Sequence, residues 1–251
     1  MSELEALKKA IETFLFKIYL SPDLCCLAEA DEGEQGDLID AVVKVRKIIA
    51  DDLGFVFGSV HIMDNLDLAE STYQILLDDT VLCNGSVEPD KLLVLLGEDL
   101  DRECLPFDLK IVKEPVFGID AAWIEEDDAR YYEDMGCNVV SAGTVLHTHL
   151  YEVCKANAHL LFRMESLLAL LEVERECSDR LIDYLIPDKI TVERLHALLC
   201  RLLKEKMSLK PFSLVLESIA HYEDQDDPKP DVEIFMKDRL KAFNDDMTVI
   251  S

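Results

Sequence analysis

The stretch DLIDAVVKVRKIIADDLGFVFGSVHIM, residues 37–63, decides the fold because it predicts a helix followed directly by a strand. Its first part carries apolar side chains at helical spacing, Asp37 can cap the helix, and Gly54 supplies the stop. Its second part, Phe55 to Met63, is a short apolar run that predicts a strand. The helical positions are Leu38, Val42, Val45, Ile49 and Leu53.

The segments on either side of this stretch add further strands. Residues 16–30, FKIYLSPDLCCLAEA, predict a strand with an irregular continuation that breaks at Pro22. Residues 71–87, STYQILLDDTVLCNGSV, predict a hairpin that turns at Asp78-Asp79. The resulting order of strand, helix, strand and strand is typical of a small α/β domain.

Two further regions follow the hairpin. Residues 87–135 alternate between short strands and acidic loops, and their Pro, Gly and Asp content predicts a small inserted unit. A strand, a tight turn and a helix from about Thr144 come next. From about His159 the patterns are helical, with an apolar stripe that predicts a helical domain. The stripe consists of Leu195, Leu198, Leu199, Leu202 and Leu203.

Composition excludes several classes of function. The chain has 251 residues, is 49% hydrophobic and carries a formal net charge of −27. Such a charge repels nucleic acids and anionic lipid, so we expect no nucleic-acid partner, and its simplest role is solubility. Eight cysteines without a CxxC motif predict reduced thiols in a cytosolic protein.

The amino terminus, MSELEALKKAIETF, predicts an amphipathic helix rather than a signal peptide. Leu4, Leu7, Ile11 and Phe14 fall on one face, and this face lies outside the expected domain core. We therefore expect the helix to pack on a neighbouring copy of the chain. No apolar run approaches the length that spans a bilayer, which predicts a soluble chain.

The segment HTHLYEVCKANAH is the main candidate for catalysis, because it offers His147, His149, Cys154 and His159 as zinc ligands. Helical ligands are expected at i and i+4, whereas the first two histidines are two residues apart and point about 200° apart. Nucleophile elbows and phosphate-binding glycine loops are missing from the sequence. We expect no enzyme activity and no cofactor; a zinc-dependent hydrolase remains the alternative.

The stretch EPVFGIDAAWI, residues 114–124, places Phe117, Gly118 and the single tryptophan between two charged segments. A core strand and an apolar recognition site both explain this pattern. Trp123 and Ile124 are expected to pack the core of the subdomain, whereas Phe117 fits both interpretations.

Four motifs in order resemble the FHIPEP family, the export-gate proteins of flagella and of type III secretion systems. They are LGFVFGSVHIMDNLDLAESTYQILL (53–77), EPVFGIDAAWI (114–124), GCNVVSAGTVLHTHL (136–150) and LLCRLLKEKMSLKPFSLVLESIA (198–220). The resemblance runs from about Phe16 to Phe243 and is slightly closer to the flagellar branch. The family often has a proline pair where this chain has Phe57-Gly58-Ser59.

The resemblance implies an α+β fold of several subdomains. A small α/β first subdomain would contain an inserted α/β subdomain and be followed by an all-α subdomain, and the family's fourth subdomain would be absent. The implied boundaries are a linker helix at 1–15, a first subdomain at 16–86 with 142–161, an insertion at 87–141, a helical subdomain at 162–243 and a tail at 244–251.

The resemblance also implies a function. The chain would be the cytosolic docking platform of an export gate, at the cytoplasmic face of the bacterial inner membrane. It would bind export chaperones with their secreted cargo and other export-apparatus proteins, and form a homo-oligomeric ring, which in the family is commonly a nonamer. It would meet the membrane only through an amino-terminal transmembrane domain that this chain lacks. A purely structural ring component is a further alternative.

In flagellar members, chaperone–cargo complexes dock in an apolar dimple where the first two subdomains meet. Carried over motif by motif, this dimple would use Phe117, Val140 and Val145, with Glu114 and Thr148 as polar guides on its rim. These five residues are the docking site that the resemblance implies.

Overall fold

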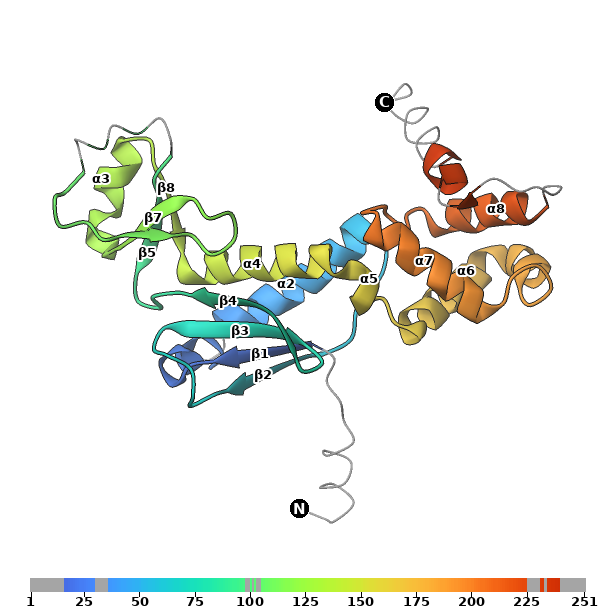
Figure 1. The fold of residues 1–251 in the computed structure, drawn as a ribbon, viewed down its shortest axis with the longest axis horizontal. Helices are drawn as coiled ribbons and strands as arrows, with labels where there is room; N and C mark the ends of the chain where they lie inside the picture. Colours follow the sequence, from blue (N-terminus) through green and yellow to red (C-terminus); the bar gives the residue numbers. More distant parts are fainter. Residues whose placement is uncertain are drawn as a thin grey trace, which may run out of the picture. The chain divides into compact units, whose positions relative to one another are not determined.

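The chain forms two compact units, one that contains both β-sheets and one that is helical (Figure 1). The first unit comprises Met1–Val45 with Ser59–Val153, and the second comprises Arg46–Gly58 with Cys154–Ser251. The expected linker helix and tail lie outside the residues that this computed structural model describes. Those residues are 16–29, 36–97, 100, 102, 105–224, 231–232 and 234–239.

The first sheet has the strand order β2-β1-β3-β4. β1 and β2 are parallel, so they need a crossover, and helix α2 (Asp37–Leu53) supplies it. The predicted order of strand, helix, strand and strand is therefore confirmed, as is the turn at Asp78-Asp79. The strands are β1 (Phe16–Leu20), β2 (Val60–Asp64), β3 (Thr72–Leu77) and β4 (Thr80–Ser86), and a 3-10 helix, η1 (Pro22–Leu27), follows β1.

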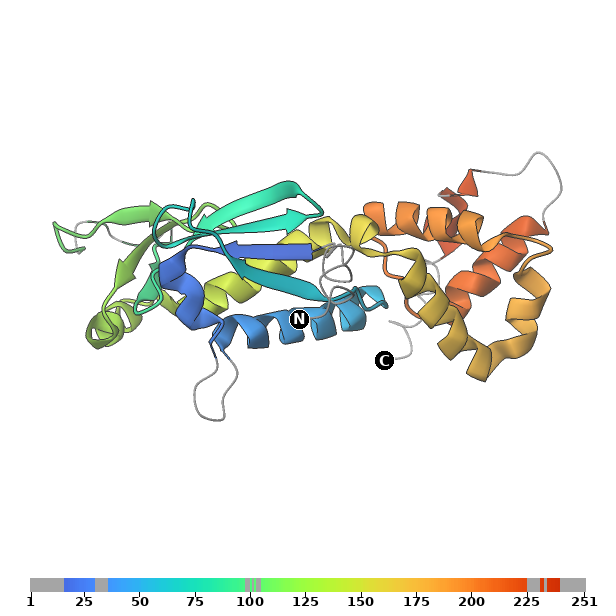
Figure 2. The same ribbon diagram turned by 90° about the horizontal axis from the view of Figure 1, so that it is seen from below.

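One face of this sheet is buried beneath α2 and α4 (Ala142–Ala156), as Figures 1 and 2 show. Phe16, Ile18 and Leu20 alternate with half-buried residues along β1, the pattern of a strand with one covered face. The first turns of the two helices are close neighbours, since a side chain at Gly143 would lie 3.2 Å from the Cβ of Asp37.

The predicted strand over 55–63 begins only at Val60. Phe55 and Phe57 belong to the helical unit, where each is at most 2% exposed. Arg46 donates to the carbonyl oxygen of Phe57 at 3.1 Å, and the ring of Phe55 meets Phe162 edge-to-face. Packing of these aromatic rings therefore overrides the local strand propensity. Gly54 ends α2 with φ +85°, as expected for a helix stop.

The second sheet has the order β6-β7-β5-β8 and also belongs to the first unit, where its strands lie between β4 and α4 in the sequence. One face buries Val94, Ala122 and Ile124 against Tyr132 of helix α3 (Ala129–Asp134). The core position of Ile124 is thus confirmed. Its strands are β5 (Leu92–Leu95), β6 (Ile111–Lys113), β7 (Asp120–Ile124) and β8 (Asn138–Ser141), and η3 (Glu126–Asp128) precedes α3.

Trp123 lies on the opposite face of this sheet and is only half-buried. It pairs across β7 and β5 with Leu93, which pairs in turn with Val140 on β8. The expectation that Trp123 packs the same core as Ile124 is wrong, because adjacent residues of a strand face opposite sides. Trp123 instead forms one row with Leu93 and Val140.

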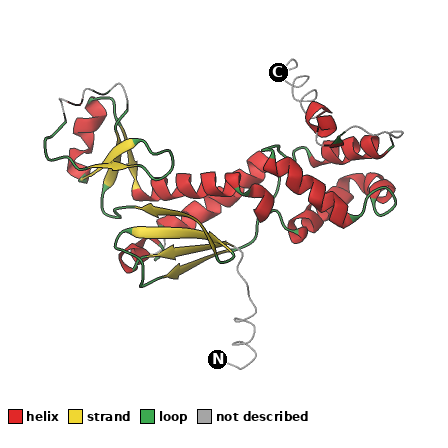
Figure 3. Cartoon of the chain, viewed as in Figure 1, coloured by secondary structure: helices red, strands yellow, loops and turns green. Residues whose placement is uncertain are grey.

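In its described part, the second unit consists of helices joined by loops and contains no strand (Figure 3). All five leucines of the predicted stripe are buried on α7, which confirms that interpretation. Helix α6 contains a kink at Ser178, whose φ and ψ of −142° and 53° are not helical. The helices are α5 (Ala158–Leu161), α6 (Met164–Leu185), α7 (Val192–Lys204) and α8 (Phe212–Glu223). Across the described ranges, no helix combines the length and apolarity needed to cross a bilayer.

Thr191 caps the amino terminus of α7, and its hydroxyl accepts a hydrogen bond from the backbone N–H of Arg194 at 3.3 Å. Thr191→Ala should lower the free energy of unfolding by about 1 kcal/mol, because it leaves this N–H without its acceptor. Urea denaturation measures the change. Thr191→Ser keeps the hydroxyl and should retain most of the stability; equal losses in both variants would contradict the capping role.

Candidate functional site

The turn between β6 and β7 holds Glu114 and Phe117 together. The carboxylate of Glu114 accepts hydrogen bonds from the backbone N–H groups of Val116 at 3.0 Å and Phe117 at 2.7 Å. The backbone of Glu114 closes the turn through bonds to Ile119 at 2.8 Å and Gly118 at 3.0 Å. Gly118 adopts φ +68°, which a larger side chain would resist.

This arrangement buries the acid and exposes the aromatic ring. Glu114 is 6% exposed, whereas Phe117 is 62% exposed. A buried carboxylate with two N–H donors fixes the backbone of the turn, so Phe117 is presented to solvent on a rigid loop. Of the two interpretations of Phe117, the structure therefore excludes a core position.

A buried hydrogen bond near Glu114 joins the first sheet to α4. The hydroxyl of Tyr73 on β3 lies 2.7 Å from Nδ1 of His149, and the two residues are 0% and 6% exposed. Burial lowers the pKa of His149, and the nearby carboxylate of Glu114 opposes that shift. Burial also raises the pKa of Tyr73. Both groups are therefore neutral near pH 7.

Gly85 on β4 makes this hydrogen bond possible. It pairs with Tyr73 across the ladder, and a Cβ at this position would lie 2.3 Å from the hydroxyl oxygen of Tyr73. Only a glycine leaves the ring enough room. Tyr73, Gly85 and the role of His149 are missed by the sequence analysis. The signal that could have found them is a glycine within a strand, which often marks a close approach of another group.

The remaining members of the predicted site lie on β8 and α4. Val140 is half-buried in the row with Leu93 and Trp123, and Thr148 is half-buried next to His149. Thr148 donates its hydroxyl proton to the carbonyl of Thr144 at 2.9 Å. Val145 is 3% exposed. The structure thus joins Glu114 with Phe117 directly, and it leaves Phe117 and Val140 accessible while it buries Val145.

A hollow of about 480 Å³ with a mixed apolar and polar lining borders the Glu114 turn. Lys113 and Pro115, which flank Glu114, form one side, and polar side chains of β3 and β4 form the other. Gln74 donates to Asn84 across these strands at 2.8 Å. The side chains of β3 and β4 that line it are Thr72, Tyr73, Gln74, Asn84 and Ser86. A partner that covers Phe117 would find hydrogen-bonding groups here.

The candidate zinc ligands do not assemble. In the ranges that the structure describes, no group of three His, Cys, Asp or Glu side chains could hold a metal ion. Nδ1 of His149 is engaged by Tyr73, and burial lowers the pKa values of His147 and His159, with Lys44 and Lys204 adding to the effect. The arrangement of these histidines gives no support to a hydrolase.

Acidification should destabilise the fold as the pH falls below about 6.5. The folded chain resists protonation of His149, whose pKa is lowered from 6.5, while the unfolded chain accepts the proton. Protonation therefore favours the unfolded state, so stability is complete above pH 6.5 and falls as the pH drops below it. His147 and His159 act in the same direction. Urea denaturation at several pH values measures the slope.

The matched variant for this prediction is His149→Gln, which keeps a polar side chain beside Tyr73 but does not titrate. We expect its stability to depend less steeply on pH than that of the unchanged chain. Identical slopes would contradict the assignment to His149.

Comparisons with known proteins extend this description. A sequence model of the FHIPEP family matches residues 1–240. The flagellar biosynthesis protein FlhA of Salmonella typhimurium is 33% identical over 200 residues, which is 79% of this chain and 28% of the relative. FlhA of Helicobacter pylori is 30% identical over 219 residues, 86% of this chain and 29% of the relative. The chain thus spans less than a third of the length of these relatives.

Solved structures show the same fold at lower identity. The Chlamydia pneumoniae CdsV protein superimposes with a TM-score of 0.76 at 20% sequence identity. The superposition covers 92% of this chain and 72% of the CdsV chain. The nonameric SctV-C from EPEC gives a TM-score of 0.62 at 13% sequence identity, and the superposition covers 90% of this chain and 64% of the SctV-C chain. At these identities the similarity concerns the fold alone.

Proposed function

Because this chain belongs to the FHIPEP family, we propose that it is a cytosolic docking platform of a bacterial flagellar or type III export gate. FHIPEP is a family of export-gate proteins of the FlhA and SctV type, and it is not a family of enzymes. The platform receives export chaperones together with the cargo that they carry. It lies at the cytoplasmic face of the inner membrane, where the membrane-embedded part of an export gate resides.

The observation that carries the proposal is the exposed ring of Phe117 on a turn fixed by a buried carboxylate. Because the ring of Phe117 is 62% exposed, much of its apolar surface is in contact with water. A partner that covers the ring would gain the free energy of burying that surface. Val140 and Thr148 would extend the contact, and Val145 would support it from within the core. Glu114 would act through the turn, because its carboxylate already binds two N–H groups.

Assembly into a ring is part of the same proposal. EPEC SctV-C is described as nonameric, and CdsV has been solved in a complex with CdsO. By analogy, this chain would associate with copies of itself and with other components of the export apparatus. The subdomain boundaries implied by the family, namely 16–86 with 142–161, 87–141 and 162–243, stay a prediction within this scheme.

Affinity capture of binding partners from a lysate of the native cell distinguishes a docking platform from a purely structural ring component. The immobilised chain should retain export chaperones with their cargo, and mass spectrometry identifies them. Recovery of further copies of the chain alone, without chaperone or cargo, would reject the platform and favour the structural role. Stoichiometric zinc in the purified chain would instead support the alternative that it is a zinc-dependent hydrolase.

A further inference from the structure

The outer edge of β4 is open to pairing with another strand. β4 ends the order of the first sheet, so no strand among the described residues pairs with this edge. It has seven residues, whereas the other strands at sheet edges, β2, β6 and β8, have five, three and four. Its sequence, TVLCNGS, contains no charged residue and no proline. Short length, charge and proline are the usual protections of an edge strand, and β4 has none of them.

The bonds between β3 and β4 determine which backbone groups of β4 point outwards. The N–H of Val87 donates to the carbonyl oxygen of Ser71 at 3.0 Å, and these two residues lie opposite each other in the register of the pair. Bonded and non-bonded positions alternate along an antiparallel pair. The backbone N–H and C=O groups of Asn84 and Ser86 therefore point away from β3.

The other side of β3 agrees with this assignment. Thr72 lies opposite Ser86, and its carbonyl oxygen accepts a hydrogen bond at 3.0 Å from the N–H of Ser21, next to β1. Thr72 thus bonds away from β4, as a member of a non-bonded pair must. Asn84 and Ser86 each present one N–H and one C=O outwards, at positions about 7 Å apart along the strand.

The same part of β4 lines the hollow beside the docking turn. Residues 84–86 lie on one side of this space of about 480 Å³, and Lys113 and Pro115 lie on the other. Both Asn84 and Ser86 are exposed. Pro115 precedes Phe117 by two residues, so the hollow adjoins the proposed docking surface. A partner that covers Phe117 is therefore close enough to reach the edge of β4.

The lining of the hollow favours an extended chain over a small molecule. Sites for small molecules are lined predominantly by apolar side chains. This hollow has polar side chains along both strands, and Gln74 donates to Asn84 at 2.8 Å on its wall. Outward N–H and C=O groups at strand spacing are matched by the backbone of another strand, which is how β-strand addition obtains its affinity.

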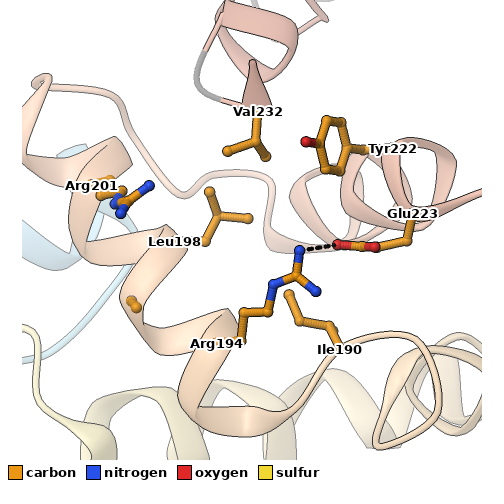
Figure 4. Close-up of a pocket in the computed structure, with 8 residues that line it drawn as sticks. Ile190, Arg194, Leu198, Arg201, Tyr222, Glu223 and Val232 are labelled. Atoms are coloured by element: carbon orange, nitrogen blue, oxygen red, sulfur yellow. Dashed lines mark ion pairs between the residues drawn. The ribbon is translucent and has the colours of Figure 1, made fainter. Parts of the chain in front are cut away.

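The pocket in the helical unit is of a different kind. It measures about 200 Å³ and lies mainly between α7 and the end of α8 (Figure 4). Backbone groups inside α7 are already bonded within the helix. Arg194 and Glu223 on its wall form an ion pair at 3.3 Å. A partner would meet mainly side chains in this pocket, whereas β4 offers a row of backbone groups.

We propose that an extended segment of the docked chaperone–cargo complex adds to the first sheet as a further strand, paired with Asn84 and Ser86 of β4. This inference rests on the proposed docking function and specifies how the partner is held. The segment exchanges backbone hydrogen bonds with β4, and an apolar side chain next to it covers Phe117. Polar side chains of the segment lie beside Asn84 and Ser86. Because the backbone supplies these bonds, segments of different sequence can use the same edge.

Hydrogen exchange resolved to single amides tests the strand addition on the full chain. The probe is the purified chaperone–cargo complex recovered by affinity capture. The outward N–H groups of Asn84 and Ser86 should exchange at least tenfold more slowly when the complex is bound. The N–H of Gly85, which faces β3, is the internal reference and should change little.

The outcomes separate this inference from the docking function. Binding of the complex without protection of Asn84 and Ser86 would overturn the strand addition and leave the docking platform intact. Failure of the complex to bind the unchanged chain would reject the platform, and the strand addition with it.

Two substitutions at one position separate backbone from side chain. Ser86→Pro removes the outward N–H, which an edge strand tolerates because that group does not bond to β3. It should weaken binding of the complex about tenfold. Ser86→Ala keeps the N–H and should bind like the unchanged chain. Urea denaturation verifies that both variants fold, and equal affinities of two folded variants would contradict the proposal.

N-methylated peptides test the same contact without altering the chain. Overlapping peptides of about ten residues from the recovered chaperone and cargo locate the segment by fluorescence anisotropy. N-methylation should weaken binding about tenfold at every second residue and have little effect at the residues between, because alternate N–H groups of a strand face β4. Equal effects at successive residues, or no peptide that binds, would overturn the strand addition.

Light scattering distinguishes a second copy of this chain as the occupant of the edge. Suppose that the unchanged chain self-associates, that Ser86→Pro but not Ser86→Ala makes it monomeric, and that neither substitution alters binding of the complex. The edge of β4 would then pair two copies, and the proposal would be overturned.

Discussion

Gly85→Ala should lower the free energy of unfolding by about 2–4 kcal/mol, a large loss for the addition of one methyl group. The added methyl group would lie 2.3 Å from the hydroxyl oxygen and ring of Tyr73. That ring is fully buried and bonded to His149, so it cannot move aside without breaking the hydrogen bond or opening the sheet. Urea denaturation measures the loss.

The matched control for this substitution is Gly97→Ala. Among the residues that the structure describes, none comes within 4 Å of a Cβ at Gly97, so the variant should retain the stability of the unchanged chain. If Gly85→Ala and Gly97→Ala were equally stable, the close approach of Tyr73 to β4 would not constrain the fold.

Phe117→Ala should weaken the binding of export chaperones by about thirtyfold or more, because a central aromatic anchor contributes roughly 2 kcal/mol or more to an interface. The free energy of unfolding should change by less than about 0.5 kcal/mol, since the ring is 62% exposed in the free chain. Calorimetric titration with a purified chaperone–cargo complex measures the first effect, and urea denaturation measures the second.

Phe107→Ala is the matched control for the docking prediction. Phe107 is another exposed phenylalanine of the same unit and lies outside the β6–β7 turn. It should bind chaperones like the unchanged chain. A large loss of stability in Phe117→Ala with unchanged affinity would reject the assignment of the docking site.

Much of the fold follows from local patterns in the sequence. The apolar spacing of α2 and its stop at Gly54 are set by short-range chemistry, and the structure has both where expected. The leucine stripe of α7 is equally local, because a helix buries one face whatever it packs against. The second sheet is harder to predict from the sequence, since its strands are short and separated by acidic loops.

The site is only partly visible in the sequence. The pattern leaves Phe117 open between core and surface, and its exposure depends on how Glu114 folds back onto the turn. The bond between Tyr73 and His149 joins residues 76 positions apart, so no local spacing reveals it. Gly85 resembles the exit of a hairpin in the sequence, whereas in the structure it lies within β4 and makes room for Tyr73.

Site-specific photocrosslinking in the native cell tests the central claim most directly. A photoreactive phenylalanine analogue at position 117 of this chain, expressed in its native cell, should form covalent adducts with export chaperones, and the same analogue at position 107 should not. Chaperone adducts at both positions alike, or at 107 and not at 117, would contradict the assignment of the exposed turn between β6 and β7 as the docking site.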